Sequence, residues 1–471
     1  MKRAKWLGVV LLLVTAISCE NFLTVEEVGR SSIPKYFSDM DGIRAAVPGA
    51  YSAVYKYYDS EFLLYPDVAG DMVNLNAVGE SVKMLSQFNF ISTPEDEPMA
   101  VGHIWTYGYE ALANVNNILE YLPQLKQKFR QHQEELEKIK GEALFLRALI
   151  HFDLVRVYAQ PYNYTADASH MGIPVVLVTP GPDDNKPRNT VFETYRQIID
   201  DLTSAEEIFR DLPLRDRYHV SLEAIQALLA KVYLNKEDWK NAMEYADKVI
   251  GKMSLSEGVD YVNMFQTLEE GKEAIFRLNG KLKKSAIAKF YSPDDPVGYA
   301  SQKLIDLFDD PQDIRLQLLE SDAGGSRYST LKYSQPSISE GEKQIDIFVL
   351  RLSEIYLLRA EARLNLDLLT EATDDIKVIQ ARALQKNSSE ITIAATTKEE
   401  LAAIIQDERA RELSFEGNRL FDIIRRKQSL ERHSSTTSTV KTIEYPDYRF
   451  VLPLPITEVE ANKNVKQNPG Y

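Results

Sequence analysis

Apolar residues recur every three or four positions along most of the chain between residues 40 and 250, with polar residues between them. This spacing is typical of α-helices that bury one face. It predicts helices over residues 40–57, 105–122, 136–158 and 191–212. Asn189 or Thr190 is a suitable N-cap for the last of these helices. Pro48 lies within the first pattern, where it would either kink the helix or mark a later start.

Two stretches have a more specific pattern, in which a pair of amphipathic helices flanks a short polar turn. One is "IQALLAKVYLNKEDWKNAMEYADKVI", Ile225–Ile250, and the other runs from Phe348 to about Leu384. Both carry a tyrosine and several alanines on one face, which indicates close packing between backbones. Each stretch resembles a tetratricopeptide unit, a helix–turn–helix of about 34 residues. Because the two units are far apart in the sequence, we expect a mainly α fold in which the helical repeat is interrupted.

The interruptions fall at residues 161–187 and 251–342, which are rich in Pro, Gly, Asn and Asp. The first contains a β-like stretch, "IPVVLV", at residues 173–178. Long segments without regular structure are usually either functional or disordered. The aromatic residues in these segments favour ordered loops.

The N-terminus has the pattern of an export signal. A positive stretch, Met1–Lys5, precedes a mostly apolar run, Trp6–Ile17, that is shorter than the ~20 residues needed to span a bilayer. The four residues at the end of this run, Ala16–Cys19, resemble a bacterial lipobox, although Ala16 replaces the usual Leu. That resemblance implies cleavage before Cys19 and attachment of fatty acyl chains such as palmitate. A plain secretory signal with an incidental cysteine is the alternative.

Cys19 is the single cysteine of the 471 residues, so the chain cannot form an intrachain disulfide. More than one acyl chain on one residue gives stable anchoring, since each buried methylene contributes about 0.8 kcal/mol. The composition otherwise describes an ordinary globular protein, with 44% hydrophobic and 27% charged residues. A net charge of −15 argues against nucleic acid as a partner, because phosphate binding needs clustered basic residues.

Motifs for catalysis are missing from the sequence. The six histidines include no pair at the i, i+4 spacing of a helical zinc site. There is also no Gly-x-Ser-x-Gly elbow and no phosphate loop. Acidic clusters such as "PEDEP" and "PDDP" are typical of solvated loops. We therefore expect a protein that is not an enzyme and that uses no metal or cofactor.

The densest charged motif is "ERARELSFEGNRLFDIIRRK", residues 408–427. Its acidic residues recur every four positions, which would place them on one helical face, and its arginines lie at salt-bridge spacing from them. A solvated charged face is one interpretation, but apolar residues on both sides indicate partial burial. The block is therefore interpreted as a structural clasp rather than a ligand site. The predicted clasp residues are Glu408, Arg409, Arg411, Glu412, Glu416 and Arg419. The chain then ends in an extended stretch around Pro453 and Pro455 and a final "NPGY" turn.

Five of these motifs together resemble the SusD/RagB-like family, the outer-membrane nutrient-binding lipoproteins of Bacteroidetes. They are "SCENFL", "GAYSAVY" (49–55), "RLSEIYLLRAEA" (351–362), the 408–427 block and the terminal "LPLPITEVEANKNVKQNPGY". One departure is "VIQARAL" (378–384), where the family usually has Asn and Arg before the Arg-Ala pair. The resemblance implies about four tetratricopeptide-like helix pairs beside an irregular, loop-rich ligand-binding region.

The resemblance also implies a division of the chain and a biological role. The expected parts are a lipoprotein signal peptide (1–18), a lipid-anchored tether (19–32), an N-terminal helical region (33–250) and a C-terminal region (251–471) with a loop-rich insert (251–347). The implied role is binding without catalysis, at the cell surface of the outer membrane, with a SusC-like TonB-dependent transporter as partner. Family members mostly bind glycans and some bind peptides, and a lipid-anchored helical scaffold for envelope proteins remains an alternative.

Candidate ligand residues follow from the chemistry of glycans, which present flat apolar faces between hydroxyl groups. Aromatic rings stack on the faces, and polar side chains bond to the hydroxyls. Two loops carry both types, "YPDVAGDMVNLN" (65–76) and "KFYSPDDPVGY" (289–299). The predicted ligand-binding residues are Tyr65, Asp67, Asp71, Asn74, Asn76, Trp105, Tyr291, Asp294 and Tyr299. Packing is the alternative role for Trp105, and turn Asn and Asp side chains can instead bond to their own backbone.

Overall fold

The computed structural model describes residues 33–76, 82–96, 100–181, 184–267, 271–280, 284–322, 324–335 and 345–471. The predicted signal peptide, Cys19 and the tether therefore lie outside the described residues. Within them the fold is mainly α-helical and is built from helix pairs, which confirms the predicted fold class. None of the described helices is both long and apolar enough to cross a membrane.

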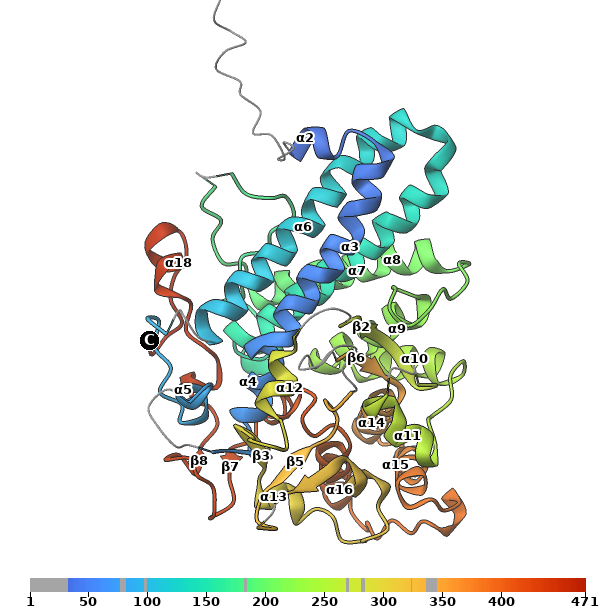
Figure 1. The fold of residues 1–471 in the computed structure, drawn as a ribbon, viewed down its shortest axis with the longest axis vertical. Helices are drawn as coiled ribbons and strands as arrows, with labels where there is room; N and C mark the ends of the chain where they lie inside the picture. Colours follow the sequence, from blue (N-terminus) through green and yellow to red (C-terminus); the bar gives the residue numbers. More distant parts are fainter. Residues whose placement is uncertain are drawn as a thin grey trace, which may run out of the picture.

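The N-terminal half forms a layer of long helices (Figure 1). These are α3 (Met40–Tyr57), α6 (Ala100–Lys128), α7 (Gln133–Tyr158) and α8 (Val191–Phe209), preceded by the short α2 (Ile33–Tyr36). In this layer α3 packs on α6, α6 on α7 and α7 on α8. Pro48 lies inside α3, which continues through it. Thr190 caps α8 through a reciprocal capping box with Glu193, as the sequence pattern predicts.

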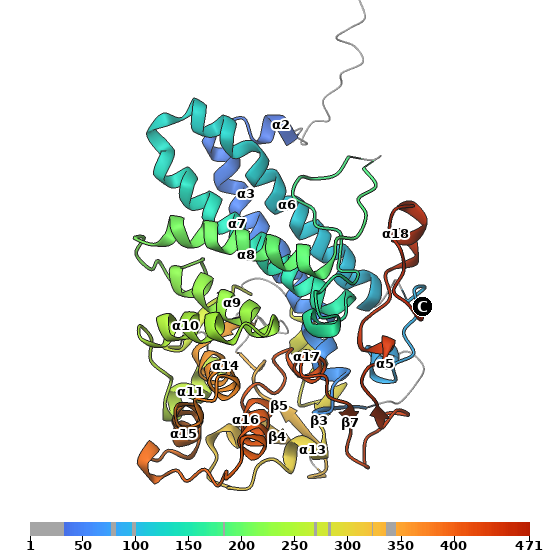
Figure 2. The same ribbon diagram turned by 180° about the vertical axis from the view of Figure 1, so that it is seen from behind.

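The two tetratricopeptide-like units form the pairs α9 (Leu222–Asn235) with α10 (Trp239–Ile250) and α14 (Leu352–Asn365) with α15 (Leu369–Leu384). They stack on each other, because α10 packs against α14, and α16 (Lys398–Glu412) extends the stack on α14 (Figure 2). The small side chains of Ala242 and Ala246 are fully buried at this level of the stack. Units that are separated in the sequence thus form one continuous helical column.

The loop-rich insert between the two units is ordered into short elements. They are α11 (Gly258–Gln266), β2 (Ala274–Leu278), α12 (Ala286–Phe290), β3 (Gly298–Ala300), α13 (Gln302–Ile305), η4 (Ile314–Leu318), β4 (Leu319–Ser321), β5 (Tyr328–Thr330) and β6 (Ile347–Arg351). Strands pair only in twos and always antiparallel: β1 (Val73–Leu75) with β3, β2 with β6, β4 with β5, and β7 (Leu430–Glu431) with β8 (Thr442–Ile443).

Short elements also join the larger helices. In the N-terminal half these are η1 (Tyr58–Phe62), α4 (Leu63–Val68), α5 (Leu85–Phe88), η2 (Arg130–His132) and η3 (Tyr162–Tyr164). In the C-terminal half they are η5 (Ser388–Glu390), α17 (Arg419–Arg425), η6 (Tyr448–Phe450) and α18 (Ile456–Ala461). Most buried apolar residues belong to one core that runs through the long helices and the column.

The expectation of a β-like stretch at residues 173–178 is wrong, because this segment is irregular. Most of its backbone hydrogen bonds are made with side chains, although the Ile173 carbonyl accepts from the Asn189 amide at 3.0 Å. The amide of Val176 donates to His151 Nε2 at 3.3 Å, and the carbonyl of Val176 accepts from Asn116 Nδ2 at 2.9 Å. The carbonyl of Pro174 accepts from the Tyr109 hydroxyl at 2.9 Å. Side chains of α6 and α7 thus satisfy polar groups that a strand would otherwise satisfy.

The expectation that Glu408, Glu412 and Glu416 share one helical face is wrong for Glu416. Helix α16 ends at Glu412 and α17 begins at Arg419, so Glu416 lies in the turn between them. Phe415 and Gly417 in this turn have positive φ values of 65° and 72°. A Cβ atom on Gly417 would lie 2.8 Å from Leu63 Cδ1 and 3.0 Å from the Leu63 carbonyl oxygen. Close contact between the turn and α4 therefore requires glycine.

Candidate functional site

The two predicted ligand loops meet in the fold, although they are more than 200 residues apart in the sequence. Strands β1 and β3 pair antiparallel, with Asn74 opposite Tyr299. The amide of Asn76 extends the pairing by donating to the Val297 carbonyl at 2.8 Å. Strand β3 also lies beside β5, which brings the β4–β5 hairpin to the same place (Figure 1).

We name the side chains gathered here the β1–β3 surface, which consists of Asn76, Asp294, Tyr299, Arg327 and Tyr328. Asp294 is exposed, Asn76, Arg327 and Tyr328 are half-buried, and Tyr299 retains 9% of its accessible area. The guanidinium carbon of Arg327 lies 5.5 Å from the centroid of the Tyr299 ring, in a cation–π contact. The surface thus combines aromatic rings with amide, carboxylate and guanidinium groups, which can stack on and hydrogen-bond to a polar ligand.

Tyr65 and Tyr291 are not part of this surface. Only 1% of Tyr65 and 2% of Tyr291 is accessible to solvent. The Tyr65 hydroxyl donates to the Phe450 carbonyl at 3.4 Å, and the Tyr291 ring stacks on Tyr333 with centroids 5.8 Å apart. Since both rings pack inside the protein, the expectation that they stack on a ligand is corrected: they support the loops from behind.

Asp67 is buried beneath the same loop. Its carboxylate accepts hydrogen bonds from the amides of Gly417, at 2.7 Å, and Arg419, at 3.3 Å. Burial raises the pKa of Asp67 from 3.8 to about 7, although the two amide donors partly offset this. Asp67 thus connects α4 to the turn that precedes α17 and does not face solvent.

Asp71 is equally buried but lies among cations. It accepts from Arg419 Nε at 2.6 Å, from Arg419 Nη2 at 2.9 Å and from Lys303 Nζ at 2.8 Å. Burial alone would raise the pKa of Asp71, but Arg419 and Lys303 outweigh it and lower the pKa to about 2. The carboxylate is therefore ionised and fully engaged with protein groups, so it supports the site instead of contacting a ligand.

Asn74 and Trp105 are also interior. Asn74 Oδ1 accepts from the Thr436 hydroxyl at 3.0 Å. Trp105 lies in α6 with its ring 4.6 Å from that of Tyr109, and its Nε1 donates to Glu458 at 3.4 Å. Packing, the alternative role for Trp105, is the one that this environment fits. Of the nine predicted ligand residues, Asn76 and Asp294 are thus accessible on the β1–β3 surface, and Tyr299 is largely buried there beneath Arg327.

The sequence analysis missed a third segment of the site, the loop of residues 432–441 between β7 and β8. Thr437 donates to the Leu75 carbonyl at 2.8 Å, beside the bond from Thr436 to Asn74. Arg432 donates to the carbonyls of Gly70 at 2.7 Å and Phe88 at 2.6 Å. In the sequence this loop, "RHSSTTSTV", has the composition of an exposed linker, so only the tertiary structure reveals its role.

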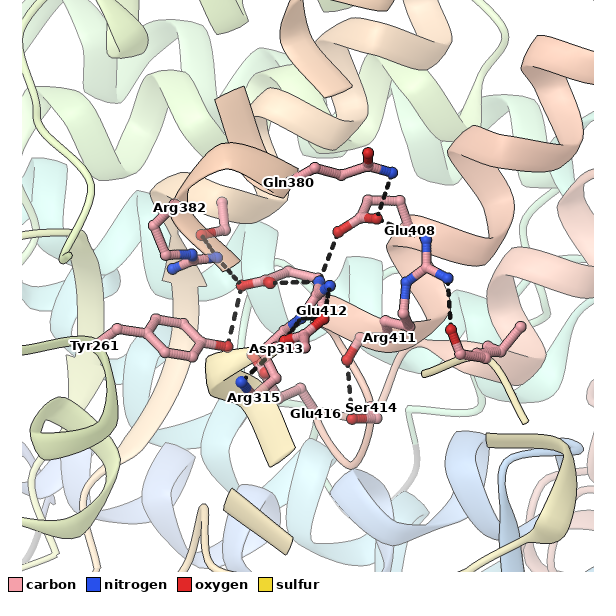
Figure 3. A network of polar contacts seen from close by, with 12 residues as sticks. Tyr261, Asp313, Arg315, Gln380, Arg382, Glu408, Arg411, Glu412, Ser414 and Glu416 are labelled. Carbon is pink, nitrogen blue, oxygen red and sulfur yellow. Dashed lines mark hydrogen bonds and ion pairs between the residues drawn. The ribbon is translucent and has the colours of Figure 1, made fainter. Parts of the chain in front are cut away.

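The predicted clasp is a buried network of ion pairs (Figure 3). Glu412 is fully buried and accepts from Arg351 at 2.6 Å, Arg382 at 2.7 Å and Arg315 at 3.1 Å. Burial alone would raise the pKa of Glu412, but the three arginines outweigh it and hold the pKa well below 4.5. Glu408 accepts from Arg315 at 2.6 Å and from Arg411 at 2.7 Å.

Most partners in the network are distant in the sequence, unlike the predicted local pairs. Arg411–Glu408 is the predicted pair that forms within the block. Arg409 instead pairs with Asp422 at 2.7 Å and Glu354 at 3.3 Å, whereas Arg419 pairs with Asp71. Glu416 accepts from Arg351 Nε at 2.7 Å. The block thus joins the helical column to the segment beneath the β1–β3 surface. The described residues contain no group of three or more His, Cys, Asp or Glu side chains arranged to hold a metal ion.

Comparisons with known proteins match nearly the whole chain. Residues 257–471 match the family model described as "SusD family", and residues 32–234 match one described as "Starch-binding associating with outer membrane". "SusD-like protein P2" of Formosa agariphila is 24% identical, with 100% of each chain covered.

Two solved structures are also similar to this chain over most of its length. A "Putative sugar binding protein" from Bacteroides vulgatus is 26% identical with a TM-score of 0.81, covering 92% of this chain and 99% of that one. A SusD superfamily protein from Bacteroides thetaiotaomicron is 25% identical with a TM-score of 0.81, covering 92% and 100%.

Proposed function

Because the chain belongs to the SusD family, we propose that it is a non-catalytic outer-membrane lipoprotein that binds a carbohydrate and delivers it to a SusC-like TonB-dependent transporter. The description of the N-terminal match refers to starch binding and the outer membrane, and the similar Bacteroides vulgatus protein is named for sugar binding. These names support the ligand class for this chain without identifying the sugar.

The observation that carries the proposal is the pairing of β1 with β3. It places Asn76 opposite Val297, two positions from Tyr299, and the β5 segment adds Arg327 and Tyr328. An oligosaccharide would stack a ring face on the exposed part of Tyr328 and donate hydroxyl hydrogens to Asp294, while the largely buried Tyr299 supports Arg327 from beneath. Arg327 would donate to ring or hydroxyl oxygens from its position over Tyr299.

Binding can be tested by affinity electrophoresis of the full chain through gels that contain neutral polysaccharides, including starch, xylan and mannan. Tyr299→Ala and Arg327→Ala should each weaken retardation by the retained polysaccharide about tenfold or more. Tyr36→Ala is the matched control, because Tyr36 is an exposed tyrosine on α2, outside the β1–β3 surface. Unchanged retardation of both site variants would contradict the assignment of the ligand to this surface.

Absence of catalysis is tested on the polysaccharide that is retained. Incubation with the purified protein should release no new reducing ends, and turnover would contradict a binding-only role. If the protein delivers its carbohydrate to a TonB-dependent transporter, a tagged chain that is extracted gently from outer membranes should co-purify with that transporter.

Anchoring is proposed to depend on Cys19. The mature wild-type protein should begin at Cys19 and carry the mass of its acyl chains. Cys19→Ala should lack these acyl chains and leave the outer-membrane fraction, because no described helix is apolar enough to hold the protein in a bilayer. An unmodified residue 19 in the mature wild-type protein would disprove the anchor.

A further inference from the structure

A groove of about 150 Å³ lies between the segment after α7 and the C-terminal segment of the chain. Its lining includes Gln160, Tyr164 and His170 on one side and Tyr448, Asn468 and Pro469 on the other. None of its lining residues belongs to the β1–β3 surface. The volume is below that of sites for drug-sized ligands, which is about 300–1,000 Å³, so the groove is sized for a single sugar ring.

Tyr448 presents a fixed aromatic ring at this groove. The ring rests on Gly470, where a Cβ atom would lie 2.4 Å from Tyr448 Cγ. The Tyr471 ring meets it edge-on, with centroids 5.0 Å apart, and the Tyr471 hydroxyl is held by the Val451 carbonyl at 2.9 Å. Tyr448 nevertheless remains 44% exposed. The terminal "NPGY" turn thus supports the ring from beneath and leaves its other side open.

Tyr164 offers a second exposed ring from the opposite side. It is also 44% exposed, and its ring lies 5.3 Å from that of His170 at 64°. Both nitrogens of His170 are engaged, Nε2 with the Gln160 carbonyl at 3.0 Å and Nδ1 with Thr165 Oγ1 at 2.9 Å. Burial lowers the pKa of His170, which keeps the imidazole neutral at pH 7. Both exposed tyrosines are therefore oriented before any ligand arrives, which reduces the entropy that binding must overcome.

The wall of the groove also contains an acceptor without a donor. Gln160 Nε2 donates to the Asp447 carbonyl at 3.2 Å, but Gln160 Oε1 is buried and has no hydrogen-bond partner among the described residues. A buried acceptor that lacks a partner is costly, and a ligand hydroxyl would satisfy it once the Gln160 side chain turns toward the groove. The nearest carboxylate, that of Asp447, is already paired with Arg449 at 2.8 Å.

We propose that this Tyr164–Tyr448 groove is a second carbohydrate-binding site, which takes a pyranose ring against the tyrosines with a hydroxyl donating to Gln160. Two oriented rings beside a neutral amide fit a ligand that has both apolar faces and hydroxyl donors. A proline-rich peptide fits less well, because proline lacks the backbone N–H that could donate to Gln160. The residues that line the groove belong to no named strand, so an extended peptide would find no strand edge to pair with there.

The test measures binding of maltoheptaose, cellohexaose, xylohexaose and mannohexaose to the full chain by calorimetry. Wild type should bind at least one of them at two sites per chain. Tyr448→Ala and Tyr164→Ala should each weaken the second site about tenfold or more. Gly470→Ala should do the same without removing an aromatic ring, because the new Cβ displaces Tyr448. Tyr36→Ala should bind as wild type does, and thermal melts verify that each variant is folded.

The outcomes separate the two sites. If Tyr299→Ala removes binding at one site and the groove variants remove it at the other, both proposals hold. If only Tyr299→Ala weakens binding, the groove proposal is overturned and the β1–β3 surface stands. If only the groove variants weaken binding, the groove stands and the β1–β3 surface fails. Binding of decaproline that depends on Tyr448, with none of the four sugars bound, would also overturn the groove proposal.

Discussion

Asp71 and Arg419 form a two-pronged ion pair across 348 positions of sequence, with Nε–Oδ1 and Nη2–Oδ2 distances of 2.6 and 2.9 Å. Asp71 belongs to one predicted ligand loop and Arg419 to the predicted clasp. The pair therefore makes the loop and the clasp parts of a single structure beneath the β1–β3 surface. This arrangement suggests that the buried charges serve to hold the surface loops in one geometry.

Replacing Asp71 should test this role directly. Asp71→Asn leaves Arg419 and Lys303 without their carboxylate in a buried site, which should lower the free energy of unfolding by about 3–5 kcal/mol. Urea unfolding measures the change. Asp374→Asn, at an exposed position of α15, is the control and should change stability by less than about 0.5 kcal/mol. A loss from Asp71→Asn as small as that of the control would show that the pair contributes little.

Asp67 should make stability depend on pH in the neutral range. Because its pKa rises from 3.8 to about 7 on folding, the folded chain holds a proton that the unfolded chain releases. The stabilisation is complete below pH 3.8 and is lost as pH rises through 7. Between pH 5 and pH 7, the free energy of unfolding of wild type should therefore fall by about 2–3 kcal/mol more than that of Asp67→Asn, whose amide does not titrate.

Urea unfolding of both proteins at pH 5, 6 and 7 checks this difference. Asp71→Asn, measured in the same series, is the comparison for pH dependence. Because the pKa of Asp71 is lowered, this carboxylate contributes the same stability at all three pH values, and its replacement should not change the slope of stability against pH. Parallel pH profiles for wild type and Asp67→Asn would contradict the prediction.

Glu412 should be the most sensitive position of the clasp. Glu412→Gln removes the charge that Arg315, Arg351 and Arg382 share, and this should cost about 3–5 kcal/mol of stability. Differential scanning calorimetry would detect it as a large fall in Tm. Glu371→Gln, at an exposed position of α15, is the matched control. Equal Tm values for the two variants would disprove the structural role of Glu412.

Arg432 should order the loops behind the β1–β3 surface. Arg432→Lys keeps the charge but loses the planar donor group that bonds to the carbonyls of Gly70 and Phe88. Amide hydrogen exchange in residues 68–76 and 431–440 should therefore accelerate at least about tenfold. Arg449→Lys, which alters a partly exposed arginine of the C-terminal segment, should leave both segments unchanged. Unaltered exchange in Arg432→Lys would contradict the proposed ordering.

Local sequence patterns predicted the helices well, because helical periodicity and capping depend on residues that are close in the chain. Helix α3 has its predicted bounds, and Thr190 caps α8. The same local reasoning failed where the tertiary structure supplies the partners. The 173–178 segment has β propensity but bonds to side chains of α6 and α7. The helix expected to carry Glu408, Glu412 and Glu416 on one face ends at Glu412, before the turn that contacts α4.

The sequence by itself determined that this is a mainly helical chain with paired repeat units, and it indicated which two loops carry ligand-type residues. Only the tertiary structure decided that those loops pair, that Tyr65 and Tyr291 lie inside while Tyr299 lies largely buried beneath Arg327, and that Asp71 bonds to Arg419. The reason is physical: tyrosine, aspartate and asparagine serve equally well in a core network or at a binding surface. Their role is therefore set by burial and by partners that the fold brings from distant parts of the chain.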